Sequence, residues 1–87
     1  MNKSIITAGY HLLLLRLKTI RWEKGLSQKD LATRLSKPQS FVSRVERGER
    51  RIDVIELRQY CAALEVPFVD FVQELDAEIR TRGINNG

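Results

Sequence analysis

Residues 27–48 read SQKDLATRLSKPQSFVSRVERG and contain two short amphipathic patterns separated by a break of three residues. Ser27 is a favourable N-cap for the first pattern. The break ends in Pro38, which suits a helix start and disfavours helix in the residue before it. The apolar positions that recur at helical spacing in the two patterns are Leu31, Ala32, Leu35, Val42 and Val45. We therefore expect helices at about residues 28–35 and 39–47, which pack together as a helix-turn-helix over about residues 27–48.

Three further helices are expected around this pair. Apolar spacing predicts a first helix over about residues 7–24, which Gly25 ends as a left-handed cap. Asp53 and Glu56 form a capping signal for a fourth helix, and Pro67 opens a fifth that runs to about residue 81. No strand pattern of useful length occurs. The fold class is therefore all-α, a compact five-helix bundle in which residues 1–87 are one domain and residues 83–87 a frayed tail.

The composition limits what this chain can be. Its 87 residues are 43% hydrophobic and 30% charged, which is typical of a small globular domain with a modest core. One cysteine excludes an internal disulfide, and one histidine with one cysteine cannot form a structural zinc site. We expect no cofactor and no metal. The longest apolar run, from Leu12 to Leu15, is far too short for a membrane span, so we expect a cytoplasmic protein with no membrane partner.

Charge is unevenly distributed along the chain. Residues 16–58 contain twelve Lys or Arg and six Asp or Glu, whereas residues 59–87 contain two and five. The middle of the chain therefore suits a polyanion such as double-stranded DNA, and the C-terminal part does not. The sequence shows no nucleophile–base pair, metal cluster or phosphate-binding loop, which argues against an enzyme.

The helix-turn-helix and its surroundings match a known family at many positions. These are Arg21, residues 25–28, Leu31, Ala32, Leu35, residues 42–48, Leu57, Ala63, Leu64 and Val66. Together they resemble the phage repressor/Cro-type helix-turn-helix domain, the XRE family, over roughly residues 10–75. The resemblance implies a lambda-repressor-like bundle whose third helix enters the major groove of DNA. The family usually has glycine where Ser36 and Glu65 stand, positions that favour a positive φ and strain a residue bearing a Cβ.

The resemblance also implies roles for individual residues. Gln39, Ser40 and Arg44 would reach base edges, which agrees with the preference of glutamine for adenine and of arginine for guanine. Gln28 would bind a phosphate. The structural pair that the family forms between its first and third helices maps to Arg21 and Glu46. Further phosphate candidates, chosen because they flank the motif, are Lys29, Lys37, Ser43, Arg50 and Arg51.

Phe41 is bulkier than the small polar residue common at its position in the family. Three roles for its side chain stay open at this point. The ring could cover the junction between the two helices, touch a sugar or a thymine methyl group, or pack on a partner.

These observations favour a sequence-specific DNA-binding transcriptional regulator with no small-molecule effector. The fifth helix, about residues 67–81, carries apolar residues over an arc wider than one packing face needs. Those left over for a homodimer interface are Val69, Val72 and Ile79. Such a dimer would bind a palindromic operator. The alternatives are the antitoxin of a toxin–antitoxin pair or a restriction–modification controller protein, and, less favoured, a protein-interaction module that binds DNA weakly and without sequence preference.

Overall fold

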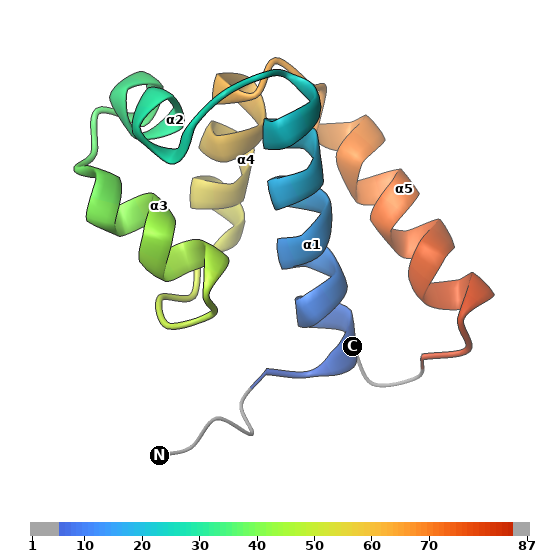
Figure 1. Ribbon diagram of the computed structural model, residues 1–87. Coiled ribbons are helices and arrows are strands. Elements are labelled where there is room, and N and C mark those ends of the chain that lie inside the picture. The colour runs from blue at the N-terminus through green and yellow to red at the C-terminus, as the bar shows by residue number, and fades with distance from the viewer. Residues whose placement is uncertain (1–5, 85–87) are drawn as a thin grey trace.

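The computed structural model describes residues 6–84, which form five α-helices joined by short turns (Figure 1). The helices are α1 (Ala8–Glu23), α2 (Gln28–Leu35), α3 (Gln39–Glu46), α4 (Val54–Ala63) and α5 (Phe68–Thr81). The helices α1, α2, α3 and α5 each lie within one residue of their expected bounds, and α4 begins directly after its expected cap, Asp53. No strand is found within residues 6–84, so the all-α prediction is confirmed. Most of the expected frayed tail, residues 85–87, lies outside the described residues.

Local side-chain hydrogen bonds set where α2 and α4 begin. The Ser27 hydroxyl accepts a 3.0 Å hydrogen bond from the backbone N–H of Asp30, and the Asp30 carboxylate accepts one of 2.9 Å from the N–H of Ser27. These bonds hold the pKa of Asp30 below its ordinary value. Asp53 and Glu56 form the same reciprocal box, at 2.8 and 2.9 Å, at the start of α4. Two expected helix starts therefore rest on complete capping boxes.

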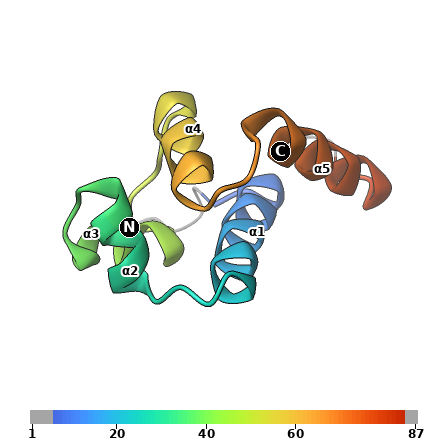
Figure 2. The ribbon, with the colours of Figure 1, turned by 90° about the horizontal axis from the view of Figure 1, so that it is seen from above.

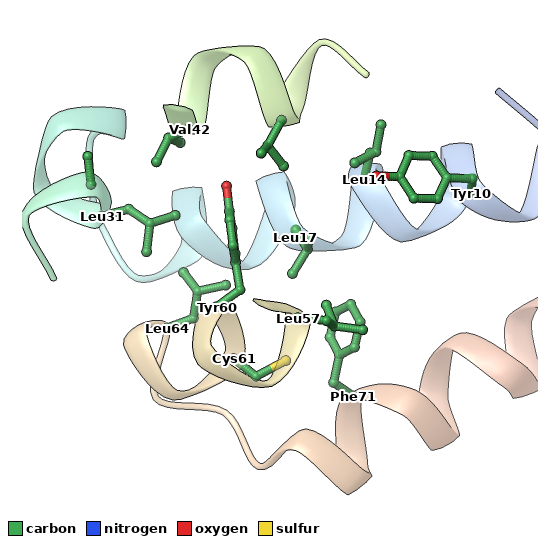
Figure 3. Close-up of a cluster of buried hydrophobic side chains, with 12 residues drawn as sticks. Tyr10, Leu14, Leu17, Leu31, Val42, Leu57, Tyr60, Cys61, Leu64 and Phe71 are labelled. Atoms are coloured by element: carbon green, nitrogen blue, oxygen red, sulfur yellow. The ribbon is translucent and has the colours of Figure 1, made fainter. Parts of the chain in front are cut away.

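The hydrophobic core gathers side chains from all five helices (Figure 3). Its largest fully buried members are Tyr60, Phe71, Leu17, Leu31, Leu64, Val42, Val45 and Cys61. Ala32 is also buried, and its small side chain lets α2 and α3 cross closely. Burial raises the pKa of the Cys61 thiol to about 11, so this group stays protonated and unreactive at neutral pH.

The helices place the helix-turn-helix and α5 on opposite sides of α1. Figure 1 shows α2 and α3 on one side of α1 and α5 on the other, and Figure 2, seen from above, shows the same separation. Both α1 and α4 contact the two sides, since α4 packs on α2 and on α5. Among residues 6–84, no helix is long and apolar enough to cross a membrane.

Two turns contain residues with a left-handed backbone. Ser36, between α2 and α3, has a φ of 57°, and Glu65, between α4 and α5, has a φ of 62°. Both are the positions at which the sequence suggested a positive φ without glycine. A residue with a Cβ is strained in this region, so each turn stores a small amount of conformational energy.

Glycine at either of these positions is expected to stabilise the protein. Ser36→Gly and Glu65→Gly should each raise the free energy of unfolding by about 0.5–1 kcal/mol, because relief of the Cβ strain outweighs the greater freedom of glycine in the unfolded chain. Ser36→Ala and Glu65→Ala are matched controls, which remove the same side-chain groups but keep the Cβ. Urea unfolding followed by circular dichroism measures the difference. Equal stability of the glycine and alanine variants would contradict the prediction.

Candidate nucleic-acid interface

The third helix, α3, has one buried face and one exposed face. Val42 and Val45 are 0% exposed and join α3 to the core. The opposite face carries three exposed polar side chains: Gln39, Ser40 and Arg44. Ser40 and Arg44 lie one helical turn apart, so they point to the same side. The buried valines therefore determine which polar side chains α3 presents to solvent.

A buried ion pair determines how α3 sits in the molecule. Arg21, near the end of α1, donates to both carboxylate oxygens of Glu46, the last residue of α3, through Nε at 2.6 Å and Nη2 at 3.1 Å. Only 7% of the Arg21 side chain and 4% of the Glu46 side chain are exposed. The remaining Nη1 of Arg21 donates to the carbonyl of Leu26 at 2.8 Å. One guanidinium thus links α1, the α1–α2 turn and α3.

Two glutamines extend this link to the exposed face. The Gln28 amide nitrogen donates to Glu46 Oε1 at 2.9 Å. The Gln39 amide nitrogen in turn donates to Gln28 Oε1 at 3.5 Å. The first residue of α2 and the first residue of α3 are therefore side by side, and both are connected to the buried pair.

The basic loop after α3 is held at several points. The Arg44 carbonyl accepts from the backbone N–H groups of Glu49, at 2.9 Å, and of Arg50, at 3.2 Å. The Arg50 guanidinium donates to both Glu56 oxygens, at 2.7 and 3.1 Å, and this contact lowers the pKa of the Glu56 carboxyl. The Arg51 guanidinium lies 4.1 Å from the centre of the Tyr10 ring. The loop cations are therefore fixed against the body of the protein.

The remaining phosphate candidates are in three different settings. Lys29 is exposed on the first turn of α2. Lys37 is exposed in the α2–α3 turn, and its ammonium is 5.2 Å from the centre of the Phe41 ring. Ser43 is half-buried on α3, and its hydroxyl accepts a hydrogen bond from Arg47. The structure thus groups Lys37 with Arg50 around Phe41, whereas the Arg51 guanidinium lies on the Tyr10 ring. Lys29 contacts no aromatic ring within residues 6–84.

Sequence reasoning missed two features of this surface. It did not find the contact of Phe41 with two cations, and it did not identify Glu56 as the ion-pair partner of Arg50. Arg50 lies in a loop six residues before Glu56, a spacing that no helical or strand rule connects. The sequence contains no signal that would have found this pair.

The exposed side of α5 carries the residues expected at a dimer interface. Val69 is 62% exposed and Val72 is 40% exposed, whereas Ile79 is half-buried. Arg16 of α1 forms ion pairs with Glu74 and Glu78, which hold the other side of α5 against α1. Val69 and Val72 therefore form an exposed apolar surface on α5.

The helix-turn-helix family provides the decisive comparison. A sequence model of this family, HTH_3, matches residues 17–71, from the middle of α1 to the first turn of α5. The chain belongs to the XRE-type helix-turn-helix family. It is a transcriptional regulator of this family, which is a family of DNA-binding regulators.

Several members of the XRE family resemble this chain closely. An XRE-family like protein from Pseudomonas syringae pv. tomato is 42% identical, with a TM-score of 0.81 over 87% of this chain and 93% of that one. The restriction-modification controller protein C.Esp1396I is 32% identical, with a TM-score of 0.76 over 84% of this chain and 96% of that one. An uncharacterised HTH-type transcriptional regulator, y4dJ of Sinorhizobium fredii, is 39% identical over 57 residues, which are 66% of this chain and 74% of the relative.

The buried pair is expected to contribute strongly to stability in this XRE-family domain. Arg21→Met or Glu46→Leu leaves one uncompensated buried charge, and each change should lower the free energy of unfolding by about 3 kcal/mol. The double variant should lose clearly less than the sum of the two single changes, as measured by urea unfolding.

The exposed pair formed by Arg47 and Glu49 serves as a control for this cycle. Their side chains are 55% and 56% exposed, so Arg47→Met and Glu49→Leu should each change the free energy of unfolding far less than the Arg21 and Glu46 changes do. Strictly additive effects of the Arg21 and Glu46 changes would show that the two charges do not depend on each other.

Proposed function

We propose that this transcriptional regulator binds DNA sequence-specifically through α3 and acts as a homodimer on a palindromic operator. The observation that carries the proposal is the exposed face of α3, with Gln39, Ser40 and Arg44, on a helix that the buried Arg21–Glu46 pair holds in place. A helix held in this way can enter the major groove as a rigid body, with its N-terminal residues at the base edges.

The side chains on this face match the chemistry of base edges. The Gln39 amide can form two hydrogen bonds with adenine, the Arg44 guanidinium can form two with guanine, and the Ser40 hydroxyl can donate or accept. Gln28 lies beside Gln39, where a side chain that contacts the flanking phosphate would be needed. Lys29, Lys37, Ser43, Arg50 and Arg51 are further phosphate contacts in this proposal.

The charge distribution supports an approach of DNA from the helix-turn-helix side. Residues 16–58, which contain α2, α3 and the basic loop, carry a net charge of +6, and residues 59–87 carry −3. Because α5 lies on the other side of α1, its carboxylates stay away from the phosphates when α3 faces DNA (Figure 2). The two halves of the charge pattern thus favour a single orientation.

Exposed valines on α5 support the proposed homodimer. A pair of α5 helices related by a two-fold axis would cover Val69 and Val72, and Ile79 lies at the end of the same helix. This pairing would bring two α3 helices to successive turns of the major groove, about 34 Å apart. The relative C.Esp1396I has been solved as a tetramer in complex with its natural 35 base-pair operator, which shows that a chain of this fold can assemble on DNA.

A restriction–modification controller is the second candidate function. The likeness to C.Esp1396I covers 84% of this chain and 96% of that controller protein, so it spans most of both chains. A controller would bind an operator that lies next to restriction and modification genes. Mapping the selected operator onto the genome distinguishes this role from that of a general regulator.

Selection of bound fragments from a random DNA pool tests the proposed function directly. We expect a consensus made of two inverted half-sites, because a two-fold dimer contacts DNA symmetrically. Recovery of unrelated sequences, with no enrichment over rounds of selection, would contradict sequence-specific binding.

Replacement of Arg44 is expected to remove base discrimination. Arg44→Ala should weaken binding to the selected site by about 1–3 kcal/mol and relax the preference at one base pair in each half-site. Lys29→Ala is the matched control, because it removes one exposed cation of α2 that is proposed to contact phosphate. That variant should weaken all sequences alike and make the salt dependence shallower. Equal losses on specific and random DNA for Arg44→Ala would show that α3 is not the reading helix.

Replacement of Val72 is expected to dissociate the dimer. Val72→Glu puts a charge into the proposed apolar interface, so sedimentation should show a monomer and operator affinity should fall at least tenfold. Val54→Glu is the control for oligomeric state, since Val54 is a 62% exposed valine on α4. A Val72→Glu protein that sediments as the wild type and binds the operator equally well would exclude this interface.

A further inference from the structure

The Phe41 side chain contacts two cations that come from different parts of the chain. The Lys37 ammonium is 5.2 Å from the ring centre, and the Arg50 guanidinium carbon is 5.1 Å from it. Both distances lie within the range of about 6 Å at which an aromatic face attracts a cation. Lys37 precedes α3 and Arg50 follows it, so the fold alone brings them to one ring.

The ring itself has a fixed position next to the reading face. Phe41 is the third residue of α3, directly after Gln39 and Ser40, and its side chain is half-buried against the core. Its backbone N–H donates to the Pro38 carbonyl at 3.0 Å. A side chain held by the core and by the first helical turn can hold other side chains in turn.

The two cations differ in how many of their hydrogen-bond donors are already used within the protein. Arg50 Nη1 and Nη2 donate to the Glu56 carboxylate, at 3.1 and 2.7 Å, and Nη1 also donates to the Arg51 carbonyl. The Lys37 ammonium forms no hydrogen bond or ion pair within residues 6–84, although its charge helps to lower the pKa of the Glu56 carboxyl. Its three donors are therefore available to a ligand. Lys37 is therefore the freer of the two to bind a phosphate oxygen, while Glu56 holds Arg50, the ring's other neighbour, in place.

We infer that Phe41 is a positioning residue for DNA binding, whose ring holds the Lys37 ammonium where a backbone phosphate lies when α3 occupies the major groove. This inference rests on the proposed function. A lysine side chain has four rotatable bonds, and their ordering on binding opposes affinity. The ring restricts the lysine before DNA arrives, so less freedom is lost in the complex. Since the contact is to a phosphate, the effect is the same for every DNA sequence.

A double-mutant cycle on DNA affinity tests this role. Lys37→Ala should weaken binding several-fold on the selected operator and on random DNA, and it should lower the salt slope by about 0.9, as expected for one phosphate contact. Phe41→Leu keeps an apolar side chain but removes the aromatic face, and it should weaken both DNAs roughly threefold. In the Phe41→Leu background, Lys37→Ala should have a clearly smaller effect than in the wild type.

Two further variants separate positioning from a general structural role. Phe41→Tyr keeps the ring and should retain wild-type affinity and salt slope, even if its melting temperature differs. Lys29→Ala should cost the same factor with Phe41 or Leu at position 41, because Lys29 has no aromatic contact within residues 6–84. If Phe41→Leu does not fold, Phe41→Met replaces it, since methionine fills a similar volume without an aromatic face.

The outcomes that overturn the inference differ from those that overturn the proposed function. An equal factor for Lys37→Ala in both backgrounds would exclude positioning by Phe41. A Phe41→Leu protein that loses preference at one base pair but keeps its affinity for random DNA would show that the ring contacts a base. The proposed function fails separately, if the wild type selects no DNA sequence or if Arg44→Ala leaves discrimination unchanged.

Discussion

The buried ion pair between Arg21 and Glu46 is the interaction on which the arrangement of this domain depends. Both charges are almost fully removed from water, so they are tolerated only because nearly all their hydrogen-bonding capacity is used. Two guanidinium nitrogens of Arg21 donate to the Glu46 carboxylate, and the third donates to the Leu26 carbonyl. The carboxylate also accepts a hydrogen bond from Gln28. These bonds have directions, unlike apolar contacts. They therefore determine the angle of α3 relative to α1 and α2, where the core alone would allow small rotations.

The polar side chains that connect this pair to the exposed face of α3 become less buried from Glu46 to Gln39. The Glu46 side chain is almost fully buried, Gln28 is half-buried, and Gln39 is exposed and donates to Gln28 at 3.5 Å. Ser40 and Arg44 lie beyond them in solvent. A DNA base edge can replace the long Gln39 contact at little cost, whereas it cannot disturb the buried bonds beneath. The decrease in burial from Glu46 through Gln28 to Gln39 thus leaves the outermost side chains available to a ligand, while the buried bonds hold α3 in place.

The parts of the molecule on the two sides of α1 differ in charge and in exposed apolar surface. The side with α2 and α3 is basic and carries the side chains that we propose to bind phosphates and bases, and the side with α5 is acidic with two exposed valines. Because α1 lies between them, the carboxylates of α5 stay away from the proposed DNA surface (Figure 2). This separation also allows the proposed dimer contact and the proposed DNA contact to form at once, which a two-fold complex requires.

The sequence by itself determined the helices, the fold family and the exposed face of α3. Helix starts such as Ser27 with Asp30, and buried positions such as Val42 and Val45, depend on neighbours within four residues, so local spacing is enough to find them. Only the tertiary structure decided that Lys37 and Arg50 meet on the Phe41 ring and that Glu56 holds Arg50. These contacts join a turn, a loop and the start of α4, where the chain has no periodicity. Their partners are selected by how the turn before α3, the loop after α3 and the start of α4 come together in the fold.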